Sequence, residues 1–452
     1  MILRYASLMT VMFLLLAPGF GGADEAILDI RELQQDHRAY LDVSLTESLM
    51  LDPQVQQQRD REYNDRHFSP WRGNPPRSGL DDIVFEFEKY EQNRGYGKNG
   101  RKHGADWIKG LRANAGLQDY SPGGHPAITL RRSGLRALPT GDPHFNSPQQ
   151  AVSGHPFDNL QATAVMVNTP VFISHVSRDK KWVWAETGYY FGWLQAQDVA
   201  TLPAGFLKSW ETGRYAVIVR DKTPLYDAQG LFLFRVSLGT VFPLVGEGEA
   251  NVEILVAVAE GDRAVLKKVT VSKDAAAAKP VPMTTAQMAH MANELIGEPY
   301  GWGGLNGHRD CSAMLRDLFA PFGIWLPRNS TEQALESGTY IDLSKLSAED
   351  KEKQIISRGI PYLTLLWRKG HIMLYIGRHN GRPLVFHNLW GISTRPLPDQ
   401  KGKLIVGHAA ITTLHPGREL PDYHKASADL STNILGMTLL AGQPESPPPP
   451  GF

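Results

Sequence analysis

The spacing of apolar residues changes along this 452-residue chain, and the change limits the folds open to it. Between residues 121 and 274, short alternating runs are separated by turn residues such as Asn168-Thr169-Pro170. Two sets of short strands of this kind predict two small β-barrels, over residues 121–204 and 205–274. From residue 284 on, two segments with helical spacing precede apolar strands, which is the order of an α+β domain.

The remaining segments connect or flank these three units. Residues 24–120 are polar and partly helical, without a cluster of titratable groups, and predict an arm or brace for the domains that follow. Residues 275–283 are rich in Ala and bounded by Pro, which is typical of a linker. The α+β domain is expected over residues 284–420. Residues 421–452 are polar and end in a proline run, so we expect a disordered tail.

The first 23 residues have the pattern of a secretory signal peptide. Arg4 precedes an apolar run from Leu8 to Ala17, and small residues, Gly21-Gly22-Ala23, offer a cleavage site. The run is shorter than the ~20 apolar residues that span a bilayer, although an uncleaved anchor is the alternative. No later stretch is long enough to cross a membrane. We therefore expect export to the periplasm, cell envelope or extracellular space, without membrane insertion after cleavage.

Charge and cysteine content narrow the function. Lys plus Arg and Asp plus Glu both number 47, so nothing in the net charge favours binding to nucleic acid or an anionic membrane. Cys311 is the single cysteine of the chain. Exported proteins usually pair their cysteines, so a single one is either a small buried hydrophobe or a reactive thiol.

The residues around Cys311 favour the reactive thiol. Tyr300-Gly301-Trp302-Gly303-Gly304 leads to Asp310-Cys311-Ser312 at the expected start of a helix. Backbone N–H groups at a helix start lower a thiol pKa and can bind an oxyanion. The glycines would let a substrate approach the backbone closely, although such a loop can also serve packing alone.

Two histidines are placed to act as a base and its partner. His371 opens one apolar strand and His387 ends the next, so an antiparallel hairpin would make them neighbours. His387 would then accept or share the Nδ1 proton of His371. Taken alone, a strand-end histidine is more often structural, and His379 in the turn between them is expected to face solvent. No His-Glu-x-x-His motif or nearby carboxylate has metal-ligand spacing, so we expect neither metal nor cofactor.

Several motifs together resemble the NlpC/P60 peptidoglycan hydrolases. They are Pro299 to Gly304, Asp310-Cys311-Ser312, Leu326-Pro327-Arg328, Gln333 and Gly370-His371-Ile372. The barrels resemble bacterial SH3 domains, through Phe157 to Gln161 and Gly192-Trp193, and Phe68-Ser69-Pro70-Trp71 resembles the N-terminal segment that accompanies these enzymes. The resemblance implies a papain-like catalytic domain after two SH3-like barrels. It also implies cleavage of the amide between γ-D-glutamate and a diamino acid, commonly meso-diaminopimelate, in wall stem peptides.

The resemblance also assigns roles residue by residue. It implies Cys311 as nucleophile, His371 as general base and His387 as the orienting residue, with Tyr300 and the Cys311 N–H at the oxyanion site. Ser312 would contact the D-glutamate side, and Trp302 is a further candidate for substrate binding. Asp310 and Arg328 fit the motif as well, with a structural role at least as plausible for each. Tyr189, Tyr190 and Trp193 are candidate groove contacts, with the barrel core as the alternative.

One departure from the family pattern bears on the substrate. Relatives that recycle free stem peptides have Pro-Arg-Asp at this position, and the Asp binds the free amine of the N-terminal L-alanine. Here Asn329 follows Pro327-Arg328. Thr169 aligns with an acidic residue that the first barrel of those relatives supplies. Neither residue carries the charge that makes ammonium binding strong. We therefore expect a monomeric hydrolase acting on intact peptidoglycan, with a recycling enzyme for free peptides and a non-catalytic wall binder as alternatives.

Overall fold

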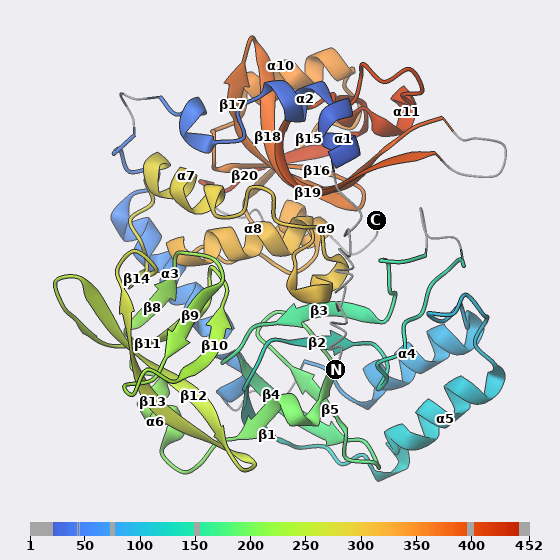
Figure 1. Ribbon diagram of the computed structural model, residues 1–452, viewed down its shortest axis with the longest axis vertical. Helices are drawn as coiled ribbons and strands as arrows, with labels where there is room; N and C mark the ends of the chain where they lie inside the picture. The colour runs from blue at the N-terminus through green and yellow to red at the C-terminus, as the bar shows by residue number, and fades with distance from the viewer. Residues whose placement is uncertain are drawn as a thin grey trace, which may run out of the picture.

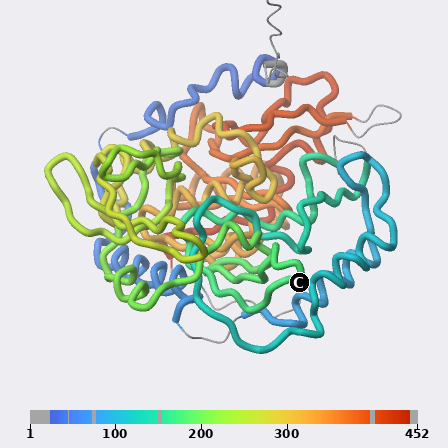
Figure 2. The backbone as a smooth tube through the Cα atoms, turned by 60° about the horizontal axis from the view of Figure 1, so that its bottom comes forward, coloured from blue at the N-terminus to red at the C-terminus, as the bar shows by residue number. Residues whose placement is uncertain are grey.

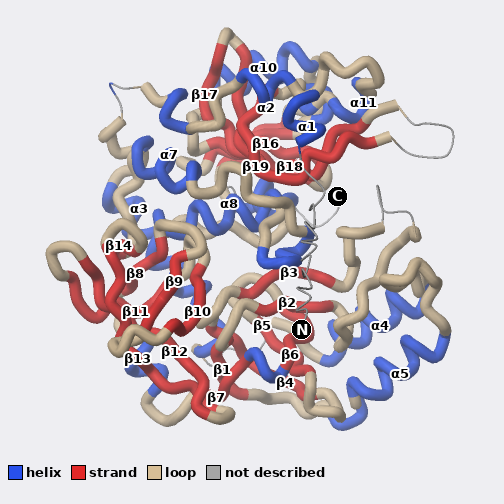
Figure 3. Tube along the Cα trace, viewed as in Figure 1, coloured by secondary structure: helices blue, strands red, loops and turns tan. Residues whose placement is uncertain are grey.

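The computed structural model describes residues 21–42, 44, 46–72, 77–148, 154–395 and 402–442 (Figure 1). The expected signal peptide, apart from residues 21–23, and the last ten residues of the expected tail lie outside this part. The described chain forms two β-rich bodies, an α+β domain and a partly helical N-terminal segment, as predicted. In Figure 3 the barrel strands lie below and the third sheet lies above, with helices between and around them.

The N-terminal segment contacts every other part of the molecule. Its helical elements are α1 (Gly21–Ala26), α2 (Leu28–Glu32), η1 (His37–Tyr40), α3 (Pro53–His67), η3 (Ser69–Trp71), α4 (Leu80–Gln92), α5 (Ala105–Ala115) and η4 (Leu117–Asp119). Figures 1 and 2 show α1 and α2 against the C-terminal domain and α4 and α5 beside the first barrel. Asp29 accepts the N–H of Thr413 at 2.8 Å, and Trp71 donates its indole N–H to the Ala127 carbonyl at 2.8 Å. These contacts are those of a brace, because they tie separate domains to one segment.

Every strand pairing within the first barrel is antiparallel, and some paired strands are consecutive in sequence while others are not. Its strands are β1 (His125–Thr129), β2 (Ser133–Arg136), β3 (Gln161–Val165), β4 (Pro170–Val176), β5 (Trp182–Glu186), β6 (Phe191–Gln195) and β7 (Val199–Thr201). They follow the order β7-β1-β4-β5-β6-β2-β3. Trp184 and Trp193 oppose each other across β5 and β6 and are fully buried. Trp193 is therefore barrel core, so its prediction as a groove contact is wrong and the core alternative holds.

The second barrel continues from the first. Its elements are α6 (Phe206–Trp210), β8 (Tyr215–Ile218), β9 (Thr223–Tyr226), β10 (Phe232–Val236), β11 (Val241–Glu247), β12 (Asn251–Glu260), β13 (Arg263–Ser272) and β14 (Ala276–Ala278). It meets the first barrel where Arg263 of β13 pairs with Thr201 of β7. It meets the C-terminal domain through buried Arg309, which binds Asp221 at 2.7 Å and Asp317 at 2.8 Å. A buried cation held by two carboxylates fixes the relative position of these two units.

The C-terminal domain places one buried helix against a sheet. Its helical elements are α7 (Thr285–Asn293), η6 (Trp302–Gly307), α8 (Cys311–Phe319), η7 (Ala320–Phe322), α9 (Ser330–Glu336) and α10 (Ala348–Arg358). The sheet runs β15 (Thr339–Asp342), β20 (Gly436–Leu439), β16 (Thr364–Arg368), β17 (His371–His379), β18 (Arg382–Ser393) and β19 (Lys403–Thr413), with every neighbouring pair antiparallel. Met314, Leu315 and Leu318 of α8 are fully buried, and α8 packs on β17 and β18. His379 is the last residue of β17, next to the expected turn, and is exposed as expected. Among the described residues, no helix is long and apolar enough to cross a membrane.

Two segments are more ordered than their composition predicts. Within the expected linker, β14 pairs with β8 of the second barrel. Within the expected disordered tail, α11 (Lys425–Ala428) and α12 (Leu430–Asn433) lead to β20, which lies between β15 and β16. The prediction of disorder is therefore wrong for residues 421–442. The segment is ordered because Ile434, Met437 and Leu440 are fully buried, although the residues around them are polar.

A charged cluster holds this returning segment in place. His415 binds Glu352 through Nε2 at 2.7 Å and Asp429 through Nδ1 at 3.0 Å. Hydrogen bonds to both carboxylates raise the pKa of His415 to about 9. Since that value lies above the pKa of about 6.5 in the unfolded chain, the stabilisation is complete below pH 6.5 and is lost as pH rises through 9.

We therefore expect the free energy of unfolding to fall by on the order of 2 kcal/mol between pH 6.5 and 9.5 because of His415. His415→Gln should be less stable than the parent protein at pH 6 and nearly equal to it at pH 9.5. Urea unfolding of both proteins across this range measures the difference. Parallel curves with a constant gap would contradict the role of the histidine charge.

Candidate functional site

Cys311 is the first residue of α8 and lies at the helix start that the sequence predicts. Asp310 caps the helix, since its side chain accepts the Ala313 N–H at 2.9 Å. The thiol is buried, and this burial together with the Asp310 charge raises its pKa to about 12. Hydrogen bonds from the Ile372 and Ser312 backbones lower the pKa, but they do not compensate. The expectation of a lowered thiol pKa is thus wrong for this structure, because desolvation outweighs the N–H groups.

His371 and His387 are neighbours, as predicted, although His387 lies within its strand and not at the expected strand end. His371 opens β17, His387 lies in β18, and His371 Nε2 is 2.8 Å from His387 Nδ1. The hydrogen bond therefore involves Nε2 of His371 and not Nδ1, which corrects the predicted geometry. The backbone of Ile372, the residue after His371, lowers the pKa of Cys311, and β17 packs on α8, so the strand brings the histidine close to the thiol.

A third residue, Thr412 of β19, fixes the protons on these two rings. Its hydroxyl donates to the Thr413 carbonyl at 2.7 Å and lies 3.0 Å from His387 Nε2. Because the single hydroxyl proton is used, Thr412 accepts from His387 Nε2–H, and His387 Nδ1 is left as an acceptor. His371 then donates from Nε2, and its Nδ1 keeps a free lone pair. Burial lowers the pKa of both histidines, so both rings are neutral at pH 7.

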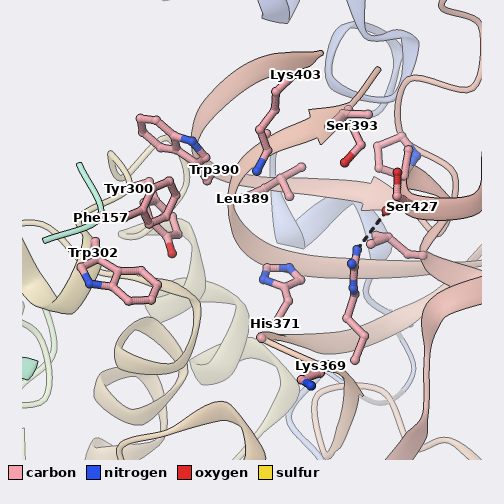
Figure 4. Close-up of a pocket in the computed structure, with 17 residues that line it drawn as sticks. Phe157, Tyr300, Trp302, Lys369, His371, Leu389, Trp390, Ser393, Lys403 and Ser427 are labelled. Atoms are coloured by element: carbon pink, nitrogen blue, oxygen red, sulfur yellow. Dashed lines mark hydrogen bonds between the residues drawn. The ribbon is translucent and has the colours of Figure 1, made fainter. Parts of the chain in front are cut away.

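Tyr300 and Trp302 line one pocket with His371 (Figure 4). The pocket has a volume of about 190 Å³, and its aromatic side is formed by Phe157, Tyr300, Trp302 and Trp390. The indole N–H of Trp302 donates to the Asp158 carbonyl at 3.1 Å, which fixes the ring. Burial, and the proximity of Cys311 and Asp310, raise the pKa of Tyr300 well above its ordinary value. Its phenol therefore stays protonated and able to donate a hydrogen bond.

Ser312 lies next to the candidate nucleophile, but its hydroxyl is already engaged. It donates to Asp310 at 3.2 Å and accepts from Arg328 at 2.9 Å, and the residue is buried. Arg328 also binds Asp310 at 2.6 Å and donates to Thr163 of β3 at 2.5 Å. This buried group fixes the helix start against the first barrel, so the structure favours a structural role for Arg328 and Asp310. It offers no free Ser312 hydroxyl for a D-glutamate contact.

The glycines before Cys311 make room for the first barrel. Gly303 and Gly304 have φ values of +57° and +83°, and a Cβ at Gly304 would lie 2.3 Å from the Ala164 Cβ. Gln161 donates its side-chain N–H to the Gly303 carbonyl at 2.9 Å. The strand β3, and not a substrate, therefore approaches the backbone of these glycines closely. The loop serves packing, which was the alternative to substrate binding.

The candidate contacts on the first barrel lie in a different place. Thr169 and Tyr189 line a second pocket, together with Tyr63, Arg316 and Trp325, and neither lines the pocket at His371. Thr169 is buried, with its hydroxyl donating to the Met166 carbonyl at 2.8 Å. Tyr189 donates to the Ala164 carbonyl at 3.0 Å beneath the Arg316 guanidinium. The structure therefore does not support their prediction as substrate contacts in the pocket at His371.

Asn329 precedes α9 and has a charged neighbour. Its side-chain N–H donates to the Glu332 carboxylate at 2.9 Å. Both residues are half-buried. A carboxylate thus lies beside the position where the sequence predicts only an uncharged amide.

Sequence reasoning missed three residues of the site. Thr412 orders the histidine pair, and Arg368 and Lys403 line the pocket beside His371. No motif identifies any of them, because each reaches the site through strand pairing alone; the register His387 with Ala410 places Thr412 nearby. In the part of the chain that the structure describes, no group of three His, Cys, Asp or Glu side chains could hold a metal ion.

The site and fold define a thiol hydrolase with a papain-like catalytic domain, and comparisons with known proteins identify its family. Family models match four stretches of the chain. They are the NLPC_P60 stabilising domain, N term, at residues 8–120, an SH3 domain of SH3b1 type at 143–195, an SH3 domain of SH3b2 type at 204–249 and the NlpC/P60 family at 297–399. A comparison with curated proteins found no significant match.

The solved structures that are similar to the chain include two of bacterial NlpC/P60 proteins. A novel NlpC/P60 endopeptidase from Photobacterium damselae subsp. piscicida is 25% identical, with a TM-score of 0.80, over 91% of this chain and 98% of that one. An NlpC/P60 family protein from Bacillus cereus ATCC 10987 is 17% identical, with a TM-score of 0.46, over 70% of this chain and 99% of that one.

The chain belongs to the NlpC/P60 family, with an N-terminal stabilising segment and tandem bacterial SH3 domains. It is an enzyme, a cysteine peptidase among the hydrolases, and in general terms a peptidoglycan hydrolase.

Proposed function

We propose that this protein is an exported DL-endopeptidase that cleaves the γ-D-glutamyl–diamino acid amide of wall stem peptides through Cys311, His371 and His387. The observation that supports it most is the 2.8 Å contact between His371 and His387. The strand that His371 opens, β17, packs on the helix that begins at Cys311. A neutral His371 with a free Nδ1 lone pair is able to accept a proton.

The proposed reaction proceeds in two acyl-transfer steps. The Cys311 sulfur attacks the γ-glutamyl carbonyl as its proton passes to His371 Nδ1, because the raised pKa leaves the resting thiol protonated. The Cys311 N–H and the Tyr300 hydroxyl stabilise the oxyanion. His371 gives the proton to the leaving amine as the C–N bond breaks. It then takes a proton from water, which attacks the thioester and releases the D-glutamyl carboxylate and the free thiol.

The expected substrate is intact peptidoglycan, since Asn329 lacks the charge that binds a free N-terminal amine. A second candidate is an enzyme for free stem peptides, and the Glu332 carboxylate beside Asn329 favours it. Thr169 supports neither, because it lies in the second pocket.

Mass spectrometry of products tests the proposal on two substrates separately, intact sacculi and free L-Ala-γ-D-Glu-diaminopimelate. Cleavage of sacculi at the γ-D-glutamyl bond is the expected result. Cleavage of the free peptide alone would establish the second candidate, and a Glu332→Gln variant should then lose that activity. Cleavage at any other bond would overturn the proposed specificity.

A further inference from the structure

The pocket at His371 has a cationic side as well as an aromatic one. Arg368, Lys369 and Lys403 line it, and no carboxylate does among its described lining residues. Figure 4 shows Lys369 below His371 and the Lys403 side chain above it, beside Trp390. The cationic side therefore adjoins the proposed general base directly.

These cations have no counter-ion among the described residues. Arg368 makes one hydrogen bond, to the Ser427 carbonyl at 3.4 Å, and none of the three is in an ion pair of the described chain. Arg368 and Lys403 are half-buried. Burial lowers the pKa of Lys403 and of His371, and the positive charge of Arg368 lowers both further. Two half-buried like charges that no described carboxylate neutralises repel each other, and an anionic group bound between them would relieve that repulsion.

The position of the pocket says which part of a substrate enters it. His371 must reach the leaving amine, so the residue that carries this amine lies on the His371 side of the scissile bond. At ~30 Å³ for each water-sized group, the 190 Å³ volume has room for a side chain of several non-hydrogen atoms.

We propose that Arg368 and Lys403 bind a carboxylate of the leaving diamino acid and so select stem peptides that carry meso-diaminopimelate. This inference rests on the proposed endopeptidase activity. The carboxylate has two possible sources, the distal carboxyl group of the diamino acid and the C-terminal carboxyl group of the stem. An L-lysine stem would instead place an ammonium group among the cations, which repel it.

The test uses the full-length protein and four N-acetyl-L-Ala-γ-D-Glu-X peptides. X is meso-diaminopimelate, its distal amide, its C-terminal amide or L-lysine, and kcat/KM is measured for each. We expect one of the two amides to be cleaved about 10- to 100-fold more slowly than the parent peptide, which identifies the carboxylate that is bound. The lysine peptide should be cleaved more slowly still if the distal carboxylate is the group that the pocket binds.

Variants connect the selectivity to the pocket. Lys403→Gln should lower kcat/KM for the parent peptide about 10-fold and change kcat/KM for the poorly cleaved amide by no more than about twofold. Lys403→Glu should raise kcat/KM for the lysine peptide relative to the parent peptide. Arg368→Lys should retain the selectivity. Lys353→Gln, at an exposed lysine of α10, is the control and should change nothing.

The outcomes separate this inference from the proposed function. Equal cleavage of all four peptides by the parent protein would overturn the inference and leave the endopeptidase intact. An equal loss on every peptide in Lys403→Gln would also overturn it, since the lysine would then act on folding or on the reaction itself. If no peptide is cleaved at the γ-D-glutamyl bond, the proposed function fails and this inference fails with it. The peptide series alone remains decisive if a variant does not fold.

Discussion

Replacing Cys311 with Ala is expected to abolish product formation from sacculi and from stem peptides. The thiol forms the acyl-enzyme in the proposed mechanism, and no other cysteine exists in the chain to replace it. Removing the nucleophile of a comparable triad costs on the order of 10⁶-fold in kcat, so turnover should fall by at least ~10³-fold, to the limit of detection. Release of γ-D-glutamyl products over time, followed by mass spectrometry, measures the loss.

The control for this variant is its fold and its binding to the wall. Cys311 is buried among α8 and the sheet, and its loss removes a single sulfur atom, so the free energy of unfolding should change by only about 1–2 kcal/mol. Sedimentation with sacculi should be unchanged, because the barrels do not depend on the thiol. A folded Cys311→Ala protein that still releases product would refute Cys311 as the nucleophile. If the parent protein sediments with sacculi but releases no product, it is a non-catalytic wall binder.

The catalytic candidates could be predicted because their signals are local. A cysteine at a helix start and two histidines on paired strands require only the start of α8 and the pairing of β17 with β18, although His387 lies within β18 and not at its end. The register of a hairpin follows from its turn, so residues at its open end meet in space. The predicted α+β order and the two barrels likewise depend on hydrophobic period, which each segment shows by itself.

The residues that surround the candidates depend on contacts far apart in sequence. A side chain at Gly304 would clash with Ala164, and Arg328 donates a hydrogen bond to Thr163. Ala164 and Thr163 both lie on β3, a strand of another domain. Thr169 failed as a predicted contact because alignment fixes a position in a sequence but does not fix the direction in which a barrel loop points. β20 was missed because a strand inserted between β15 and β16 shows only a few apolar residues in a polar segment. Such features need the tertiary structure.

Replacing His387 with Ala is the prediction with the next largest effect. His387 Nδ1 accepts the Nε2 proton of His371, and without it the His371 ring is free to carry its proton on Nδ1, where the base must be vacant. Disrupting the orienting residue of a triad in this way costs about 10⁴-fold in kcat, and we expect a loss of roughly 10³- to 10⁴-fold. His387→Asn, whose side-chain oxygen can accept the same hydrogen bond, should recover most of the rate.

Thr412 extends the same argument by one residue and gives a smaller, separable effect. Thr412→Val keeps the shape of the side chain but removes the acceptor for His387 Nε2–H, which then has no reason to leave Nδ1 unprotonated. The loss of one buried hydrogen bond, worth about 1–2 kcal/mol, predicts a fall in kcat of ~10-fold with KM unchanged. Thr412→Ser restores the hydroxyl and should restore kcat. If Val and Ser lower kcat equally, or if KM rises instead, Thr412 acts through packing alone and the proton order along Thr412, His387 and His371 is not what sets the base.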